Sequence, residues 1–262
     1  MMIEKTEEEI ELLRQSALLV SKTLAEVGIL VRPGVTTYEL DVRAEEFIRD
    51  NGGKPAFKGY RGFPATLCTS VNGQVVHGIP SKNTVLKDGD IVSLDCGVLL
   101  NGYCGDSAYT FEVGEVNEST RRLLRITKEC LFKGIEAATA KNRIGDVGYA
   151  VQQHAESNTY SVVRELVGHG IGTQVHEKPD VPNYGRRGTG VKLLKNMVLC
   201  IEPMINKGRR HIVEERDGWT IRTKDNEPSA HFELTVAVGD QRADTLSTFA
   251  FIEEKLKFNL AS

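Results

Sequence analysis

Two aspartates on either side of an Asn-Gly dipeptide are the first residues in this sequence that could do chemistry together. An Asn-Gly pair between two β-like runs is the strongest short-range signal for a β-hairpin. With Asn101 and Gly102 as the turn, Asp95 lies opposite Ala108, and Asp106 is its diagonal neighbour on the same face, roughly 7 Å away. Two carboxylates on a partly buried face are hard to keep ionised together, and a bound metal ion solves that problem. For an isolated aspartate pair, ordinary acids on a solvated strand are the commoner explanation.

Two glutamates in the second half of the chain favour the metal-binding interpretation. Glu202 follows the apolar run 197–201, and Glu233 lies in the strand-like segment 231–236 with apolar neighbours on both sides. A glutamate in such a strand is expensive to bury unless it is paired or coordinated. Each half of the chain thus contributes two acids from β-like segments. Four acids converging from two related halves have few purely structural explanations.

Three histidines near glycines extend the candidate site. His169 lies in the segment VGHGIG at 167–172, His176 follows seven residues later, and His77 lies in the turn-like segment VHGIP at 76–80. Glycine neighbours let the backbone approach closely and leave an imidazole ring accessible. A lone histidine is usually structural, but these three occur beside four strand acids. His231 alternates with Glu233 and is given no role. The P-loop motif GxxxxGK[ST] and the zinc-protease motif HExxH are absent from the sequence.

The elements that would position these residues form a repeating pattern. Thr6 with Glu9 is a capping box, and apolar residues from Ile10 to Val27 follow at steps of three and four, which predicts a helix. A second helix should end at 52–53, and a similar helix pair returns within 123–154. Each pair precedes β-rich sequence, at 90–95 and 108–111 and again at 197–202 and 231–236. This order predicts an α+β fold of duplicated helix–helix–hairpin units with helices packed on an antiparallel sheet. We expect one two-lobed domain, residues 1–262, with pseudo-repeats at about 6–115 and 118–252.

Composition excludes several classes of protein. The chain has 262 residues, 40% hydrophobic and 26% charged, which is typical of a globular protein. With 33 Lys and Arg against 36 Asp and Glu, the net charge of −3 argues against a dedicated nucleic-acid binder, so no DNA partner is expected. The five cysteines are scattered without a CxxC pair, which favours a reducing compartment. The N-terminus lacks the apolar core of a signal peptide, and no stretch is long enough for a membrane helix. We therefore expect a cytoplasmic protein without a membrane partner.

The ordered set Asp95, Asp106, His169, Glu202 and Glu233 resembles that of the bacterial type I methionine aminopeptidases, which belong to peptidase family M24. The resemblance extends from Thr6 to about Phe251. Further matching segments are GYRGFP at 59–64, VHGIP at 76–80, DIVSLD at 90–95, GHGIG at 168–172, IEP at 201–203, DGW at 217–219 and FE at 232–233. The resemblance implies the pita-bread fold, a pseudo-two-fold duplication around a curved antiparallel sheet. It also implies an enzyme that removes the initiator methionine from newly made proteins whose second residue is small.

The same resemblance implies two divalent metal ions. By position, one ion would be held by Asp106, His169, Glu202 and Glu233, and the other by Asp95, Asp106 and Glu233. Four carboxylates and one imidazole form a hard donor set, which suits Co²⁺, Mn²⁺ or Fe²⁺. Such a pair of ions can share a hydroxide that attacks the first peptide bond.

Roles for the other site residues also come from the resemblance. Glu202 would move a proton from water to the leaving amine. His176 would hydrogen-bond the carbonyl or the developing oxyanion, and His77 would contact the scissile nitrogen or the tetrahedral intermediate. The methionine side chain would be bound by Tyr60, Phe63, Cys68 and Trp219, since a thioether favours aromatic and soft neighbours. The chain departs from many relatives in having Phe63 for tyrosine, Val175 for an aromatic residue, and Gly97 for a larger residue near a metal ligand.

Two other functions share parts of this pattern. Xaa-Pro aminopeptidases and prolidases carry the same five-ligand pattern but usually have a substantial additional N-terminal domain, and only about 90 residues precede Asp95 here. A non-catalytic pita-bread binding module commonly loses ligands, whereas all five are present. The expected partners are the N-termini of nascent polypeptides. A transient ribosome contact would use the positive cluster Lys207, Arg209 and Arg210, and the protein is expected to be a monomer.

Overall fold

The computed structural model describes residues 4–259 of the chain, so residues 1–3 and 260–262 of the expected domain lie outside the described part. Its first helix, α1 (Glu7–Gly28), begins as the sequence predicts. The Glu9 amide donates to Thr6 Oγ1 at 3.2 Å, and the Thr6 amide donates to Glu9 Oε2 at 2.8 Å, which completes the capping box. The predicted apolar face is buried, and its members are Ile10, Leu13, Ala17, Val20, Leu24 and Val27.

Three of the remaining α-helices occupy the expected segments. They are α2 (Thr37–Asp50), α3 (Glu118–Ala137) and α4 (Ile144–Ser157). A short 3₁₀ turn, η1 (Tyr60–Gly62), and a C-terminal helix, α5 (Ala250–Asn259), are additions to the prediction. The sequence order of two helix pairs, each followed by strands, is thus confirmed.

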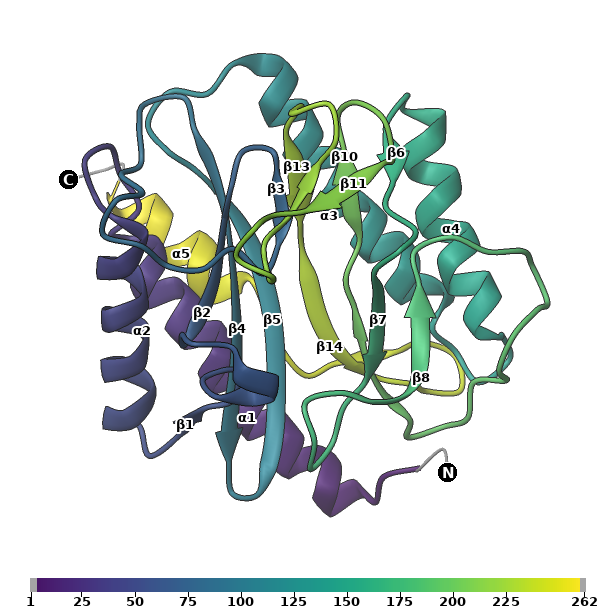
Figure 1. Ribbon diagram of the computed structural model, residues 1–262. Coiled ribbons are helices and arrows are strands. Elements are labelled where there is room, and N and C mark those ends of the chain that lie inside the picture. Colours follow the sequence, from purple (N-terminus) through teal and green to yellow (C-terminus); the bar gives the residue numbers. More distant parts are fainter. Residues whose placement is uncertain (1–3, 260–262) are drawn as a thin grey trace.

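A nine-stranded antiparallel sheet joins the two halves of the chain (Figure 1). Its main path is β1-β4-β5-β14-β9-β7-β8, while β2 pairs with β4 and β15 with β14. The strands are β1 (Lys54–Pro55), β2 (Leu67–Val71), β4 (Ile91–Leu100), β5 (Tyr103–Glu112), β7 (Val167–Gly170), β8 (Glu177–Pro182), β9 (Val198–Ile201), β14 (Glu233–Ala237) and β15 (Asp244–Thr245). The halves meet where β5 pairs with β14, with Glu233 opposite Ala108.

Two small sheets complete the strand inventory of the described residues. One has the order β13 (Ser229–His231), β10 (Met204–Asn206) and β6 (Ser161–Val162). The other has the order β11 (Ile212–Glu214), β12 (Ile221–Thr223) and β3 (Gln74–Val76), and so joins a strand of the first half to two of the second. These observations confirm the α+β fold class.

The β4–β5 hairpin has the predicted register. Asn101 and Gly102 both have positive φ, 52° and 83°, as a two-residue hairpin turn requires. Asp95 lies opposite Ala108, and Asp106 lies opposite Gly97. Asp95 and Asp106 are therefore diagonal neighbours on one face of the sheet, as their spacing indicates.

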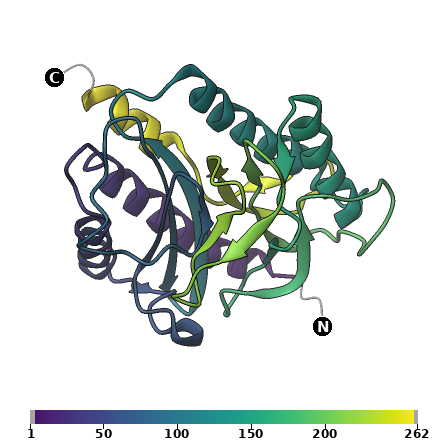
Figure 2. The ribbon, with the colours of Figure 1, turned by 45° about the horizontal axis from the view of Figure 1, so that its top comes forward.

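Helices cover one side of this sheet and leave the other side for the site. In Figure 1 the long helices α1 and α3 run behind the strands, and in Figure 2, with the top turned forward, α3 lies along the upper edge of the molecule. Helix α1 lies directly on β5, because a Cβ at Gly105 would come within 2.7 Å of the Ala17 Cα. Ser16 Oγ donates to the Tyr103 carbonyl at 2.9 Å and ties the helix to the hairpin end. The side chains that alternate away from this helix layer are free to face a cavity.

In the second half, the helix pair and the paired strands are as predicted, but the connection between these strands is longer than a hairpin turn. Strands β9 and β14 do pair, but the 31 residues between Ile201 and Glu233 form β10 to β13 instead of a tight turn. The expected strand 231–236 is also divided at Phe232. His231 pairs with Met204 in a small sheet, whereas Leu234 pairs with Ile201 in the large one. Phe232 is buried against Tyr109, with ring centroids 4.9 Å apart, at the point where the chain changes sheets.

Candidate metal centre

Five acidic and imidazole side chains converge on one cavity from five different segments. Asp95 comes from β4, Asp106 from β5, Glu233 from β14, His169 from β7, and Glu202 directly follows β9. Adjacent antiparallel strands place these positions side by side, because each side chain lies on the face opposite the helices. Asp106 is 3% exposed and Glu233 2%. Such burial of several carboxyl groups is expensive unless a cation compensates it.

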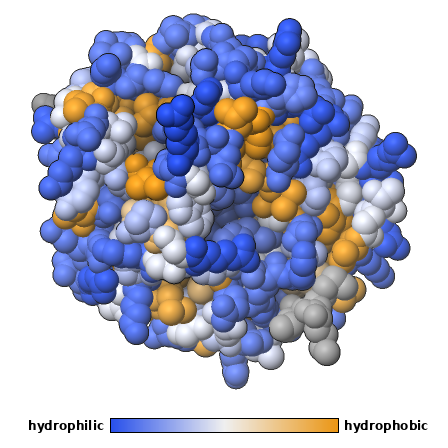
Figure 3. All heavy atoms as spheres, viewed as in Figure 1, coloured by the Kyte–Doolittle hydropathy of each residue, from blue (hydrophilic) through white to orange (hydrophobic). Residues whose placement is uncertain are grey.

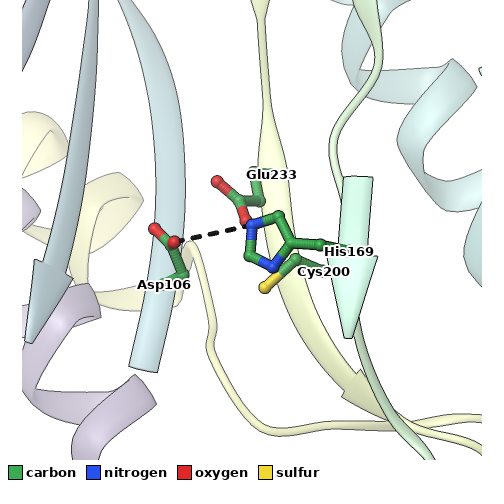
Figure 4. A group of neighbouring side chains, drawn as sticks. All are labelled: Asp106, His169, Cys200 and Glu233. Carbon is green, nitrogen blue, oxygen red and sulfur yellow. Dashed lines mark ion pairs between the residues drawn. The ribbon is translucent and has the colours of Figure 1, made fainter. Parts of the chain in front are cut away.

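His169 presents one ring nitrogen to the acids. Its Nδ1 lies 3.0 Å from the Gly170 carbonyl, to which Nδ1–H can donate, and this leaves the Nε2 lone pair available. Nε2 lies 3.6 Å from Glu202 Oε1 and 3.9 Å from Asp106 Oδ2. Figure 4 shows the His169 ring directed toward Asp106 and Glu233. Burial lowers the pKa of His169 to about 4, so the ring is neutral near pH 7, as a metal ligand must be.

Three of the carboxyl groups each have one oxygen without a donor in the described part of the chain. Asp95 Oδ1, Asp106 Oδ1 and Glu233 Oε1 are buried without a hydrogen-bond partner among the described residues. Burial raises the pKa of Asp95 to about 7. Burial, and then the neighbouring carboxylates, raise the pKa values of Asp106, Glu202 and Glu233 well above their ordinary range. A divalent cation would supply the missing partner of each orphaned oxygen, so the donor set fits a metal.

Two further residues, Cys200 and His231, lie beside these donor atoms, and the sequence pattern assigns a role to neither. Cys200 Sγ is grouped with donor atoms of Asp106, His169 and Glu233, all within 4.8 Å of one another (Figure 4). Cys200 precedes Glu202 by two positions, and this spacing is the only signal for it in the sequence. His231 Nε2 lies 3.7 Å from Glu202 Oε2, and both of its ring nitrogens lack hydrogen-bond partners among the described residues.

An aromatic pocket adjoins the acids in the same cavity. Phe63 and Trp219 meet edge to face with centroids 5.2 Å apart, and Tyr60 stacks on His176 at 5.2 Å. The cavity volume is about 140 Å³, close to the roughly 150 Å³ of an engineered cavity that binds benzene. It can therefore accept one apolar side chain. Figure 3 shows a hollow in the middle of this face of the molecule, with both hydrophobic and hydrophilic residues around it.

His77 is held at the cavity by an unusual backbone conformation. Its φ is +59°, in the left-handed region that few non-glycine residues adopt. The next residue, Gly78, cannot carry a side chain, since a Cβ would come within 2.8 Å of the Thr69 carbonyl carbon. The imidazole lies edge-on to Trp219, with centroids 6.3 Å apart. Burial lowers the pKa of His77 from its ordinary value.

The structure brings all eleven residues expected at the site around this single cavity. They are Tyr60, Phe63, Cys68, His77, Asp95, Asp106, His169, His176, Glu202, Trp219 and Glu233. Phe57, Arg61 and Val76 also line it and were not predicted. Phe57 gives no signal of its own, because a buried phenylalanine is ordinarily part of a core.

A buried carboxylate and imidazole centre beside an apolar pocket has the donor atoms of a metal site and room for one apolar side chain. A model described as metallopeptidase family M24 matches residues 11–240. A methionine aminopeptidase of Clostridium perfringens is 54% identical over 91% of this chain and 95% of its own length. One of Clostridium acetobutylicum is 49% identical over 94% of this chain and 99% of its own length. The chain belongs to metallopeptidase family M24.

Solved structures agree with this membership. The crystal structure of methionine aminopeptidase from Rickettsia prowazekii superposes with a TM-score of 0.93 at 40% identity, and the match covers 95% of this chain and 100% of that one. The prolidase from Pyrococcus horikoshii OT3 superposes with a TM-score of 0.76 at 22% identity, over 94% of this chain and 64% of that one. The second likeness shows the fold alone. The pita-bread fold implied by the sequence motifs is thereby confirmed.

Proposed function

We propose that this chain removes the N-terminal methionine from nascent polypeptides whose second residue is small. The observation that carries the proposal is that one cavity is lined both by the acidic and imidazole centre and by the aromatic side chains of Tyr60, Phe63 and Trp219. A thioether side chain bound by the aromatic wall would place the first peptide bond beside the acids. The names of the relatives that are 49% and 54% identical support the same activity.

We infer two divalent ions at the centre, Co²⁺, Mn²⁺ or Fe²⁺. Asp106, His169, Glu202 and Glu233 would hold one, and Asp95, Asp106 and Glu233 the other. The fit rests on the orphaned oxygens and on the neutral His169 imidazole. When bound, such ions polarise a carbonyl and lower the pKa of water toward neutrality.

The proposed work of the chain's own residues is proton transfer and orientation. Glu202, whose side chain is 13% exposed, would accept a proton from the attacking water and pass it to the leaving amine. Burial, followed by the neighbouring side chains of His169, Arg61 and His77, lowers the pKa of His176 to about 3, so its ring acts as a neutral hydrogen-bond donor near pH 7. Its Nδ1 lies 3.1 Å from the Tyr60 hydroxyl. If that hydroxyl donates, Nε2–H remains free to bind the carbonyl oxygen.

His77 and Cys68 complete the proposed substrate contacts. His77 would contact the scissile nitrogen or the tetrahedral intermediate, and its lowered pKa keeps the ring neutral. Cys68 lies on β2 opposite Asp95 of β4, at the junction of the pocket with the acids. Burial raises the pKa of the Cys68 thiol well above its ordinary value, so it contributes soft, uncharged surface and no nucleophile.

Two peptides offered side by side test this function. We expect metal-stripped protein reloaded with Co²⁺, Mn²⁺ or Fe²⁺ to release methionine from Met-Ala-Ser and to leave Ala-Pro-Ser intact, measured by chromatography of the free amino acid. Cleavage of Ala-Pro-Ser alone would assign the chain to the proline-specific peptidases. A folded, metal-binding protein that cleaves neither peptide would instead be a non-catalytic binding module.

We also propose that residues 1–262 form a single two-lobed catalytic domain, with pseudo-repeats at about 6–115 and 118–252. The pairing of β5 with β14 supports this, because the two lobes then share one sheet and one cavity. Cytoplasmic location and a monomeric state remain part of the proposal. Among the described residues, no helix combines the length and apolarity that a membrane crossing needs.

A transient ribosome contact is proposed for the cluster Lys207, Arg209 and Arg210. Lys207 Nζ lies 3.3 Å from Glu227, and Arg210 lies 3.6 Å from Glu165, so part of the positive charge is neutralised locally. Reversal of all three to glutamate is therefore expected to weaken ribosome co-sedimentation only about threefold. The matched control is Arg32→Glu/Lys54→Glu/Lys87→Glu, which has the same net charge change at other exposed positions. Equal sedimentation of both variants and the unmodified protein would remove this surface from the proposal.

A further inference from the structure

Lys5 and Glu177 form a nearly buried ion pair that the proposed reaction does not use. Lys5 Nζ lies 2.8 Å from Glu177 Oε2, and the two side chains are only 5% and 16% exposed. Exposed ion pairs contribute little because water screens the charges, whereas a pair removed from water is expensive to form and depends on its geometry. The pair holds together two residues that are 172 positions apart, and one of them directly follows His176.

The Lys5 end of the pair is fixed by the start of α1 and by the segment before β9. The Lys5 amide donates to the Asn196 carbonyl at 3.0 Å. Thr6, the next residue, is the N-cap of α1, and its capping box sets the direction in which the chain enters the helix. Asn196 Nδ2 also donates to Glu7 Oε1 at 3.3 Å. The Lys5 ammonium group therefore extends from a well-anchored part of the fold.

The Glu177 end of the pair organises the connection between β7 and β8, residues 171–176. Glu177 Oε1 accepts from the Gln174 amide at 3.3 Å, while Oε2 faces Lys5. Gly172 leaves room for this arrangement, because a Cβ there would come within 2.7 Å of the Glu177 carboxyl carbon and would also clash with Lys5 Nζ. In Figure 1 the start of α1 and this connection both lie at the lower edge of the large sheet. One carboxylate thus joins the two segments.

His176 is the last residue of this connection. Its ring stacks on Tyr60, and its centroid lies 4.2 Å from that of His169. His176 is exposed, so packing in a core does not hold its ring in place. A functional side chain on a loop is placed accurately only when contacts around it fix the loop. The position of the His176 ring therefore depends on what holds residues 171–176.

We propose that Lys5 and Glu177 are positioning residues, which hold the connection 171–176 so that the His176 ring can bind the developing oxyanion. The inference rests on the proposed aminopeptidase function and on the role proposed there for His176. Neither Lys5 nor Glu177 lines the cavity, so both act through the connection. Because an oxyanion donor must lie within hydrogen-bond distance of the oxygen, a small shift of the connection weakens it.

Removal of the ammonium group tests the pair. Lys5→Met keeps a long side chain, and we expect kcat for Met-Ala-Ser to fall by about 30-fold, because a misplacement of about 1 Å can cost about 100-fold. KM should stay within about twofold, since the oxyanion forms only in the transition state. Lys133→Met is the matched control, because it removes an exposed ion pair with Glu136 on α3, and kcat should stay within about twofold. Unchanged kcat in Lys5→Met, or a loss expressed only in KM, would overturn the proposal.

A double variant shows whether the pair acts through His176. His176→Ala alone should lower kcat by about 100-fold, as the loss of one oxyanion donor does. Addition of Lys5→Met to His176→Ala should lower kcat by no more than about twofold further, because no ring is left to position. A further loss of about 30-fold would mean that the pair acts on another part of the site, and the proposal would be wrong.

Glu177→Gln tests the pair without leaving an unpaired buried carboxylate, which in Lys5→Met could prevent folding. The glutamine keeps the size of the side chain, but its amide presents an oxygen to only one of the two donors, Lys5 or the Gln174 amide. We expect kcat to fall by about tenfold, and this loss should disappear in the His176→Ala background. Thermal unfolding identifies a Lys5→Met protein that does not fold, and the Glu177→Gln cycle then decides the proposal.

Nuclear magnetic resonance separates this inference from the proposed function. In the metal-free protein, a long-range ¹H–¹⁵N spectrum reports the imidazole nitrogens, and the signals missing from His176→Ala assign those of His176. We expect Lys5→Met and Glu177→Gln to shift these signals and Lys133→Met to leave them in place. Unshifted signals in both variants of the pair would overturn the inference. If the signals shift but the unmodified protein releases no methionine from Met-Ala-Ser, the proposed function fails and the positioning of His176 by the pair still holds.

Discussion

Replacement of Glu202 by alanine is expected to lower kcat for Met-Ala-Ser by at least about 1,000-fold, because it removes the proposed proton carrier and a proposed metal ligand together. The Glu202 carboxyl lies between two imidazoles, with Oε1 3.6 Å from His169 Nε2 and Oε2 3.7 Å from His231 Nε2. Burial, and then the charges of Asp95 and Asp106, raise its pKa well above the ordinary value, so it can hold a proton near neutral pH. The measurement is kcat at saturating Mn²⁺ or Co²⁺.

Two further variants show whether the loss of kcat is specific to the Glu202 carboxyl group. Glu214→Ala removes an exposed carboxylate on β11 and should leave kcat within about twofold, since surface substitutions away from a site have small effects. Glu202→Gln keeps the size of the side chain but cannot carry the proton, and should be nearly as impaired as alanine. Calorimetric titration with Mn²⁺ shows whether each protein still binds metal. A metal-loaded Glu202→Ala protein that keeps more than about a tenth of kcat would exclude Glu202 from proton transfer.

The acids at this site could be identified from the sequence because their signals are local. Asn101-Gly102 specifies a two-residue hairpin, and the register that follows puts Asp95 and Asp106 on one face, as observed. Glu202 and Glu233 were recognisable because a carboxyl group beside apolar strand residues is expensive to bury alone. Each inference needs only a few neighbouring residues. The meeting of β5 and β14, which joins the two pairs of acids, required the duplicated pattern of elements as well.

Phe57, Cys200 and the strand division at Phe232 could not be obtained in that way. Phenylalanine and cysteine are among the residues most often buried for ordinary packing, so their presence in an apolar segment does not indicate a site. The contact between Phe57 and Gly97 spans 40 positions of sequence and depends on how β1 lies on β4. At Phe232 the alternating pattern is unbroken, although the chain leaves one sheet and enters another. Periodicity specifies a strand but not the sheet to which it belongs.

In the metal-free protein, Asp106→Asn is expected to increase the free energy of unfolding by roughly 2 kcal/mol at pH 8, because replacing a buried charge that lacks a partner is stabilising. Burial and the charges of Glu233 and Asp95 raise the pKa of Asp106 well above its ordinary value. A carboxyl group with a raised pKa binds its proton more tightly in the folded state. Its charge therefore destabilises the fold progressively as pH rises from about 4, the ordinary unfolded value, toward the raised pKa of the folded state.

Urea unfolding in EDTA at pH 5 and pH 8 measures this effect, and the gain from Asp106→Asn should be largest at pH 8. Asp50→Asn replaces an exposed acid at the end of α2, and it should change the free energy of unfolding by less than about 0.5 kcal/mol at either pH.

Mn²⁺ should reverse the order of stability of the unmodified protein and Asp106→Asn, since it stabilises only a folded state that binds it. The unmodified protein then gains several degrees in Tm, and Asp106→Asn gains little. A metal-free Asp106→Asn protein that is less stable than the unmodified one at pH 8 would mean that the carboxyl is held by protein donors. The orphaned oxygens would then no longer indicate a cation site, because their burial would already be compensated without one.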